Sequence, residues 1–167
     1  MFVLGIDPGL SRCGYGVVEQ VAASRGARQR AVAAGVITTA PSENTPDRLA
    51  ELQAEARSLI AEFSPTVVAL ERVLFQTNVR TAMGVGQASG IIMAEAINAG
   101  CQVIEYSPNE IKLAIAGDGR ADKEQMEIMV KLLLNIERPL RPVDAADALG
   151  VALCHLAHHG VPAGMGA

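Results

Sequence analysis

Aromatic side chains are scarce in this sequence, and tryptophan is absent. Only 3% of the 167 residues are aromatic, whereas 50% are hydrophobic. A chain of this length and hydrophobicity can bury a sizeable core, which argues against an intrinsically disordered protein. The core must therefore be aliphatic. We expect a single domain over residues 1–159, followed by a disordered tail over residues 160–167.

Cysteine pairs and long apolar runs are also missing. The sequence has three cysteines and no C-x-x-C motif, which favours a reducing compartment over secretion. No basic segment followed by a long apolar run marks a signal peptide. The apolar stretch at residues 91–93 is interrupted by Glu95 and is too short to cross a bilayer. We expect a soluble, cytoplasmic protein with no membrane partner.

The sequence does contain a regular succession of apolar segments and turn residues. Strand-forming runs bounded by turn signals predict five strands, at residues 2–6, 14–21, 30–38, 66–70 and 102–106. The first three are joined by short links, which predicts an antiparallel meander. The continuous apolar run of the fourth is typical of a strand covered on both faces.

Helices are predicted between and after the later strands. Thr45 is expected to be an N-cap with Pro46 at the first helical position, and Ser107 and Glu110 have the spacing of a capping box. Further helices are expected over residues 79–99, 122–134 and 144–159. The order β-β-β-α-β-α-β-α-α-α predicts an α/β fold, with a mixed sheet flanked by helices on both faces. Ligands of such sheets bind at the carboxyl ends of parallel strands.

Four acidic residues stand out by their places in this pattern. Asp7 follows the first strand and Glu71 follows the fourth. If these strands are parallel neighbours, their backbones lie about 4.8 Å apart and both carboxylates leave the same edge. Asp144 and Asp147 share one face of the first turn of the last helix. Clustered carboxylates repel unless a cation lies between them, and hard oxygen ligands suit Mg²⁺ or Mn²⁺.

Each acid also has an ordinary structural explanation. An Asp before Pro-Gly is a frequent turn residue, and acids in a first helical turn are stabilised by the helix dipole. The combination of four is more specific than any single member. The net charge of −4 comes from 18 acids and 14 Lys and Arg residues. Because the candidate site accounts for this difference, the acidic balance does not exclude a polyanionic substrate.

Four motifs in chain order carry a resemblance to one family. They are GIDPGLSRCGYGVV, ALERVLFQTNVRTAMGVGQASG, GDGRADKEQM and DAADALGVALCH. Together they resemble the RuvC family of bacterial Holliday-junction resolvases, in the ribonuclease H-like superfamily. The resemblance runs from Met1 to about His159. It implies a ribonuclease H-like mixed five-stranded sheet, and it assigns catalysis and metal binding to Asp7, Glu71, Asp144 and Asp147.

The resemblance also implies an activity and partners. The family's enzymes are metal-dependent endodeoxyribonucleases that resolve four-way junctions by paired symmetric nicks in DNA recombination and repair. Two Mg²⁺ ions per active site, which Mn²⁺ can replace, drive phosphodiester hydrolysis. A homodimer is implied, together with the RuvA and RuvB branch-migration complex.

The same resemblance implies DNA contacts. Lys123 is expected to act in catalysis by contacting a phosphate, and Phe75 to act as a base-stacking wedge. The ordinary alternatives are a solvated helix start for Lys123 and core packing for Phe75. Leu74 stands where many family members have the first of two Phe residues. The expected DNA-binding set is Phe75, Arg72, Arg80, Lys112, Arg120 and Lys123.

Small residues recur every four positions in the helix predicted over residues 79–99. Ala82, Gly86 and Gly90 would allow a close backbone approach, either to the protein's own sheet or to a partner helix. Both alternatives stay open.

Two other chemistries find little support in the sequence. Three histidines beside Cys154 could bind zinc, but histidines near a helix C-terminus are favoured by its dipole in any case; they are His155, His158 and His159. Ser11 and Cys13 could be nucleophiles, but no histidine lies near them in sequence to act as a base.

Two rival functions complete the set of hypotheses. A nucleotide-binding ATPase of the actin and sugar-kinase type shares the β-β-β-α-β-α-β core, but it usually needs two such lobes and a much longer chain. A non-catalytic junction-binding scaffold would not need the four acids, all of which are present.

Overall fold

A five-stranded mixed sheet forms the centre of the molecule in this computed structural model, which describes residues 1–23, 26–72 and 79–159. The strand order is β3-β2-β1-β4-β5. The first three strands pair antiparallel, β4 pairs parallel with β1, and β5 pairs parallel with β4. The predicted meander and mixed sheet are therefore confirmed. The strands are β1 (Phe2–Asp7), β2 (Arg12–Ala23), β3 (Gly26–Thr38), β4 (Val67–Glu71) and β5 (Gln102–Tyr106).

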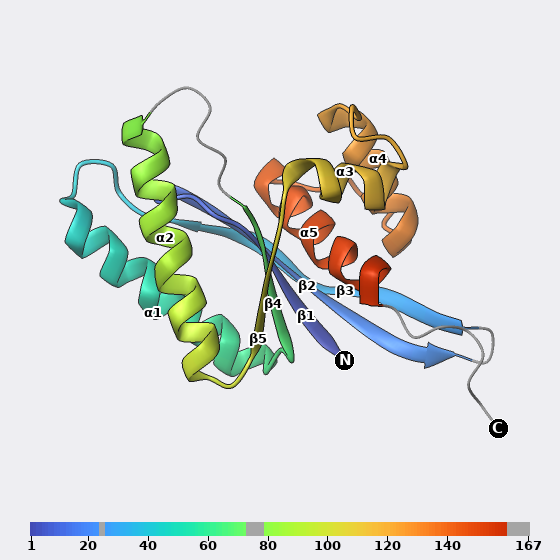
Figure 1. Ribbon diagram of the computed structural model, residues 1–167, viewed down its shortest axis with the longest axis horizontal. Helices are drawn as coiled ribbons and strands as arrows, with labels where there is room; N and C mark the ends of the chain where they lie inside the picture. Colours follow the sequence, from blue (N-terminus) through green and yellow to red (C-terminus); the bar gives the residue numbers. More distant parts are fainter. Residues whose placement is uncertain (24–25, 73–78, 160–167) are drawn as a thin grey trace.

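Helices cover both faces of the sheet (Figure 1). On one face lie α1 (Thr45–Phe63) and α2 (Val79–Asn98); on the other lie α3 (Pro108–Ala116), α4 (Lys123–Leu134) and α5 (Val143–His159). Because successive strand residues point to opposite faces, β1 contributes side chains to two hydrophobic cores. Leu4 and Ile6 pack in the cluster that includes residues of α1 and α2, whereas Val3 packs in the cluster that includes α5. Both cores are mainly aliphatic, as the composition predicts.

Helix ends follow the capping rules, with one correction. The predicted capping box of Ser107 and Glu110 is present at α3. The predicted N-cap Thr45 is wrong, because Asn44 fills that position and its side chain accepts from the Asp47 backbone N–H at 3.0 Å. Asparagine is the stronger capping residue, and it leaves Thr45 and Pro46 in the first turn. α4 has a capping box of its own at Asp122.

The β2–β3 hairpin is longer than predicted. β2 begins at Arg12 and β3 begins at Gly26, whereas the predicted strands begin at residues 14 and 30. Strand pairing therefore extends beyond the apolar segments into exposed polar residues. The link at Ser24 and Arg25 lies outside the described residues, as does the tail expected over residues 160–167. No helix in the described part of the chain has the length and apolar character needed to cross a membrane.

Candidate active site

Parallel pairing of β1 and β4 brings two acids to one edge of the sheet. Ile6 pairs with Leu70, and the next residues along the two strands are Asp7 and Glu71. Both carboxylates therefore leave the carboxyl end of the sheet from adjacent strands, as the sequence predicts. Both side chains are partly buried, because the strands that carry them are covered on both faces.

Glycines on the sheet allow the first turn of α5 to approach these acids. A Cβ atom at Gly14 would overlap the carbonyl oxygen of Asp144, and one at Gly5 would overlap that of Ala148. A Cβ atom at Gly16 would lie 2.7 Å from the Leu149 backbone nitrogen. The missing side chains let α5 lie directly against β1 and β2. This close packing carries Asp144 and Asp147 to the edge where Asp7 lies.

The four acids interact electrostatically, and the pKa values record it. Burial raises the pKa of Asp7 to about 7, and the charges of Glu71, Asp147 and Asp144 add to the rise. Burial also raises the pKa of Glu71, with a further contribution from Asp147. The pKa of Asp147 is raised by burial as well. A buried group of mutually repelling carboxylates is a setting that a cation would relieve.

Three basic side chains lie around the acids. The Lys123 ammonium is 3.5 Å from Asp147. The charges of Lys123 and Lys112 partly offset the rise in the pKa of Glu71 that burial causes. Arg12 donates from Nε at 3.0 Å and from Nη2 at 2.6 Å to one oxygen of Asp144. Sequence reasoning missed Arg12. The available signal was its spacing, because Arg12, Gly14 and Gly16 alternate along β2 and so share the face that meets α5.

The loop after Asp7 is held by a second arginine that sequence reasoning missed. Arg48 of α1 donates to the Ser11 hydroxyl at 2.5 Å and to the Thr39 hydroxyl at 3.0 Å. Thr39 in turn donates to the Leu10 carbonyl at 2.6 Å. These bonds fix the backbone between Asp7 and Arg12. Ser11 thus has a structural partner, and no feature marks it as a nucleophile.

The other predicted DNA-binding residues are scattered around this edge or fall outside the description. Arg72 follows Glu71 and its guanidinium lies 3.5 Å from the Glu105 carbonyl oxygen. Arg120 is exposed in the turn before α4. Phe75 lies outside the described residues, as does Leu74. Arg80 belongs to α2, but its side chain lies outside the description.

Cys13 and the histidines of α5 are the remaining candidates from the sequence. Cys13 is buried, and burial raises its pKa to about 12, so it is no nucleophile. His155 is buried, its Nδ1 lies 2.9 Å from the Tyr106 hydroxyl, and burial lowers its pKa to about 4. The helix-dipole explanation therefore does not apply to His155. It still suits His158 and His159, which lie in the last turn.

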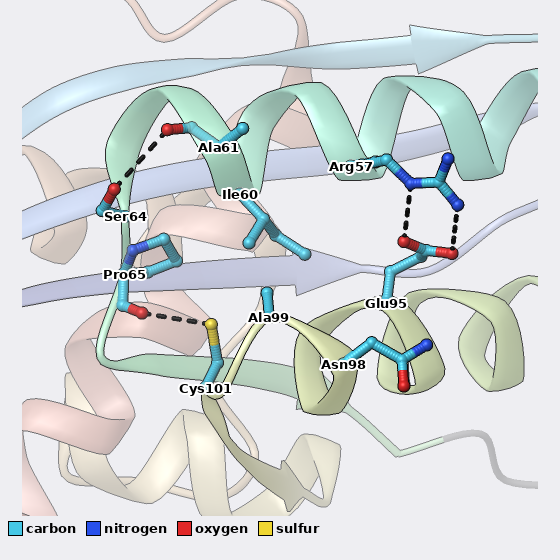
Figure 2. Close-up of a pocket in the computed structure, with 9 residues that line it drawn as sticks. All are labelled: Arg57, Ile60, Ala61, Ser64, Pro65, Glu95, Asn98, Ala99 and Cys101. Carbon is cyan, nitrogen blue, oxygen red and sulfur yellow. Dashed lines mark hydrogen bonds and ion pairs between the residues drawn. The ribbon is translucent and has the colours of Figure 1, made fainter.

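A hollow of about 550 Å³ lies between the C-terminal ends of α1 and α2 (Figure 2). It is at the amino ends of β4 and β5, whereas the acids lie at the carboxyl ends of β1 and β4. Its ion pair and its thiol already have partners. Arg57 donates to both oxygens of Glu95 at 2.9 Å, and these bonds help to lower the pKa of Glu95 to about 2. Cys101 donates from Sγ to the Pro65 carbonyl at 3.1 Å. This hollow is built from contacts that join α1 to α2, far from the four acids.

Comparisons with known proteins agree with the geometry. The family model described as "Crossover junction endodeoxyribonuclease RuvC" matches residues 3–155. A protein of that name from Salinispora arenicola (strain CNS-205) is 49% identical over 156 residues, which cover 93% of this chain and 87% of the relative.

Solved structures match as well. The Thermus thermophilus RuvC structure has a TM-score of 0.86 at 35% identity and covers 95% of both chains. The T. thermophilus RuvC in complex with Holliday junction substrate has a TM-score of 0.84 at 33% identity, with 95% of this chain and 94% of that chain covered.

These matches extend over all four of the motifs that carried the resemblance, and they confirm the ribonuclease H-like fold. A nucleotide-binding ATPase is accordingly set aside. Sequence, fold and the shared edge of acids lead to one conclusion: the chain belongs to the RuvC family of crossover junction endodeoxyribonucleases, the Holliday-junction resolvases.

Proposed function

We propose that this chain resolves Holliday junctions by hydrolysis at the four-acid site, formed by Asp7, Glu71, Asp144 and Asp147. The observation that carries the proposal is the parallel pairing of β1 and β4 beneath the first turn of α5. It gathers four carboxylates on rigid elements, which is what positioning a phosphodiester for in-line attack requires.

Two Mg²⁺ ions, replaceable by Mn²⁺, are the proposed cofactors. The donor set fits hard divalent ions because it consists of carboxylate oxygens, and three of the four carboxyl groups have raised pKa values that a cation would lower again. Among the described residues, no three side chains are already arranged to hold a metal. Asp144 and Asp147 are instead paired with Arg12 and Lys123.

Each site residue then has a proposed role. The four acids hold the ions, which when bound supply an activated water and stabilise the leaving oxygen. Lys123 is 81% exposed at the start of α4, so its ammonium is free to turn from Asp147 to a phosphate near the cut. Lys112, Arg72, Arg120 and Arg80 are proposed to bind the DNA backbone, which needs only positive charge and reach. Phe75 is proposed as the stacking wedge.

A second copy of the chain is the proposed partner at α2. One face of this helix presents exposed, uncharged and mostly small or apolar residues, with Met83 59% and Ile97 60% exposed; it comprises Met83, Gly86, Gln87, Gly90, Ala94 and Ile97. Among the described residues, no atom lies within 4 Å of a Cβ built at Gly86 or Gly90. Packing of these glycines against the protein's own sheet is therefore wrong. A two-fold dimer suits paired nicks in a four-way junction.

Cellular context follows from the family. We propose that the homodimer acts in the cytoplasm, where bacterial DNA recombines, with RuvA and RuvB supplying branch migration. The described cysteines are all free and buried, which is compatible with a reducing compartment.

Substitution of one central acid tests the proposal. Asp7→Asn keeps the shape of the side chain but removes the charge, so the variant is expected to bind a four-way junction and to cut it at least ~100-fold more slowly in Mg²⁺. Cleavage on denaturing gels and junction binding by fluorescence anisotropy measure the two properties. Undiminished cutting by the variant would remove Asp7 from the mechanism. Tight binding without cleavage by the wild type would instead support a scaffold.

A further inference from the structure

Arg12 occupies one of the two oxygens of Asp144, a proposed metal ligand. Both its Nε and its Nη2 donate to Asp144 Oδ2, at 3.0 Å and 2.6 Å. The guanidinium is therefore the counter-cation of this acid. A divalent ion at this oxygen would compete with the arginine for its lone pairs, and the two cations would repel each other.

A basic groove lies directly beside Arg12. It has a volume of about 670 Å³ and runs between the loop after Asp7, the start of α1 and the first half of α2. Its α2 wall includes Met83 and Gln87 of the proposed dimer face, so the part considered for DNA is the end formed by Ser11, Arg12 and Arg48. Arg12 and Arg48 both line it, and none of the described residues that line it is acidic. Arg48 is fixed by its bonds to Ser11 and Thr39. Arg12 has a side chain that is 52% exposed, so its flexible stem can turn from Asp144 toward the groove.

We propose that Arg12 is an exchangeable counter-cation. In the metal-free protein it neutralises Asp144; when a divalent ion binds, it gives up Asp144 and its guanidinium binds a DNA phosphate in the adjoining groove. The inference rests on the proposed function of the four-acid site. It makes Arg12 a DNA-binding residue that couples metal binding to DNA binding. Arginine suits this exchange because its planar fork matches carboxylate and phosphate oxygens equally well.

The first test is metal affinity without DNA. Mn²⁺ binding to the full-length protein, measured by electron paramagnetic resonance, is expected to become about 2- to 5-fold tighter in Arg12→Gln, because a half-exposed ion pair competes by about that factor. Arg12→Lys keeps the charge but loses the planar fork, so its Mn²⁺ affinity should lie between those of the wild type and Arg12→Gln. Unchanged or weaker Mn²⁺ binding in a folded Arg12→Gln protein would overturn the proposal.

A matched control is present in the same hairpin. Arg30 donates from Nε at 3.2 Å and from Nη2 at 2.6 Å to Glu19 Oε2, which repeats the geometry of the Arg12 pair. Glu19 pairs with Phe2, at the amino end of β1 and away from Asp7. Arg30→Gln should therefore leave Mn²⁺ affinity unchanged. An equal gain in Mn²⁺ affinity in Arg12→Gln and Arg30→Gln would show that only the net charge of the protein matters, and it would overturn the exchange.

The second test is the salt dependence of junction binding, with Ca²⁺ as the ion probe. With Ca²⁺ present, Arg12→Gln should reduce the slope of log K against log salt by about 1, the loss of one phosphate contact. In EDTA the slope should not change, because Arg12 is then held by Asp144. An equal change in both conditions, or in neither, would contradict the exchange.

Failure of the underlying site gives a different result. If the wild type bound no Mn²⁺, or if Asp7→Asn bound it as well as the wild type, the four-acid site itself would be wrong. If the wild type bound Mn²⁺ through Asp7 and Arg12→Gln behaved identically, only the role of Arg12 would be wrong.

Discussion

The carboxyl group of Asp7 has a strongly raised pKa. Its pKa is raised to about 7, first by burial and then by three neighbouring acids. An exposed Asp has a pKa of about 3.9. In the absence of metal the folded protein therefore holds a proton that the unfolded chain has already lost between about pH 4 and pH 7. Folding and proton binding are coupled at this position.

The sign of this coupling gives a stability prediction. Since the folded state binds the extra proton, the metal-free protein loses stability as pH rises from about 4 to about 7. Asp7→Asn cannot ionise, so it should be more stable than the wild type above pH 7, by up to about 4 kcal/mol, because each pKa unit is worth about 1.4 kcal/mol. The difference should vanish near pH 4. Urea unfolding in EDTA across this range measures it. A difference that does not depend on pH would contradict the raised pKa of Asp7.

Some individual residues could be predicted from sequence and others could not. Asp7 and Glu71 are recognisable because each directly follows an apolar strand, so their direction depends only on strand pairing. Arg12 follows no apolar strand, and its only signal is its alternation with Gly14 and Gly16. Its role depends on where α5 lies, which is a tertiary property. Lys123 was identified through family resemblance rather than through its spacing.

Among the secondary-structure elements, α5 decides whether the site exists. Its first turn reaches Asp7 only because β1 and β2 present glycines beneath it. Helix boundaries and caps could largely be predicted, because they depend on local residues such as Ser107. The length of the β2–β3 hairpin could not, because its outer pairs, such as Glu19 with Arg30, are polar and carry no apolar alternation.

Adding one methyl group under α5 tests its position. A Cβ at Gly14 meets the backbone carbonyl of Asp144, so Gly14→Ala must push the first turn away. We expect a loss of about 1–3 kcal/mol in unfolding free energy, as for other overpacked sites. A displacement near 1 Å would also slow cleavage about 100-fold.

A control for this substitution lies in α5 itself. At Gly150 the nearest atom to a new Cβ is Val130 Cγ2, at 3.6 Å. Gly150→Ala should cut junctions at the wild-type rate and gain up to about 1 kcal/mol, because alanine is the better helix former. Thermal melts and junction cleavage rates separate the two variants. Normal cleavage by Gly14→Ala would show that α5 need not lie so close to the sheet.

For the whole molecule, the proposed dimer is the least predictable feature. Sequence spacing left Gly86 and Gly90 with two explanations, and only the packing of α2 removed one of them. An interface between copies depends on what remains exposed after the chain has folded. No local pattern of residues contains that information.

A charge placed on the exposed face of α2 tests the dimer. Gly90→Glu should convert the dimer to a monomer, because a buried and unpaired carboxylate at a two-fold interface meets its own copy. Ala54→Glu, at an exposed position of α1, is the matched control and should leave the mass unchanged. Analytical ultracentrifugation gives both masses. A Gly90→Glu protein that remains a dimer would show that the interface does not lie on this face of α2.

The central claim is that folding gathers four distant carboxylates into one site for two divalent ions. Anomalous diffraction from crystals grown with Mn²⁺ tests it most directly. We predict two peaks about 4 Å apart, bounded by Asp7, Glu71, Asp144 and Asp147, with the Arg12 guanidinium no longer on Asp144. Crystals that hold Mn²⁺ elsewhere, or in which Asp144 and Asp147 turn away from Asp7, would contradict the account.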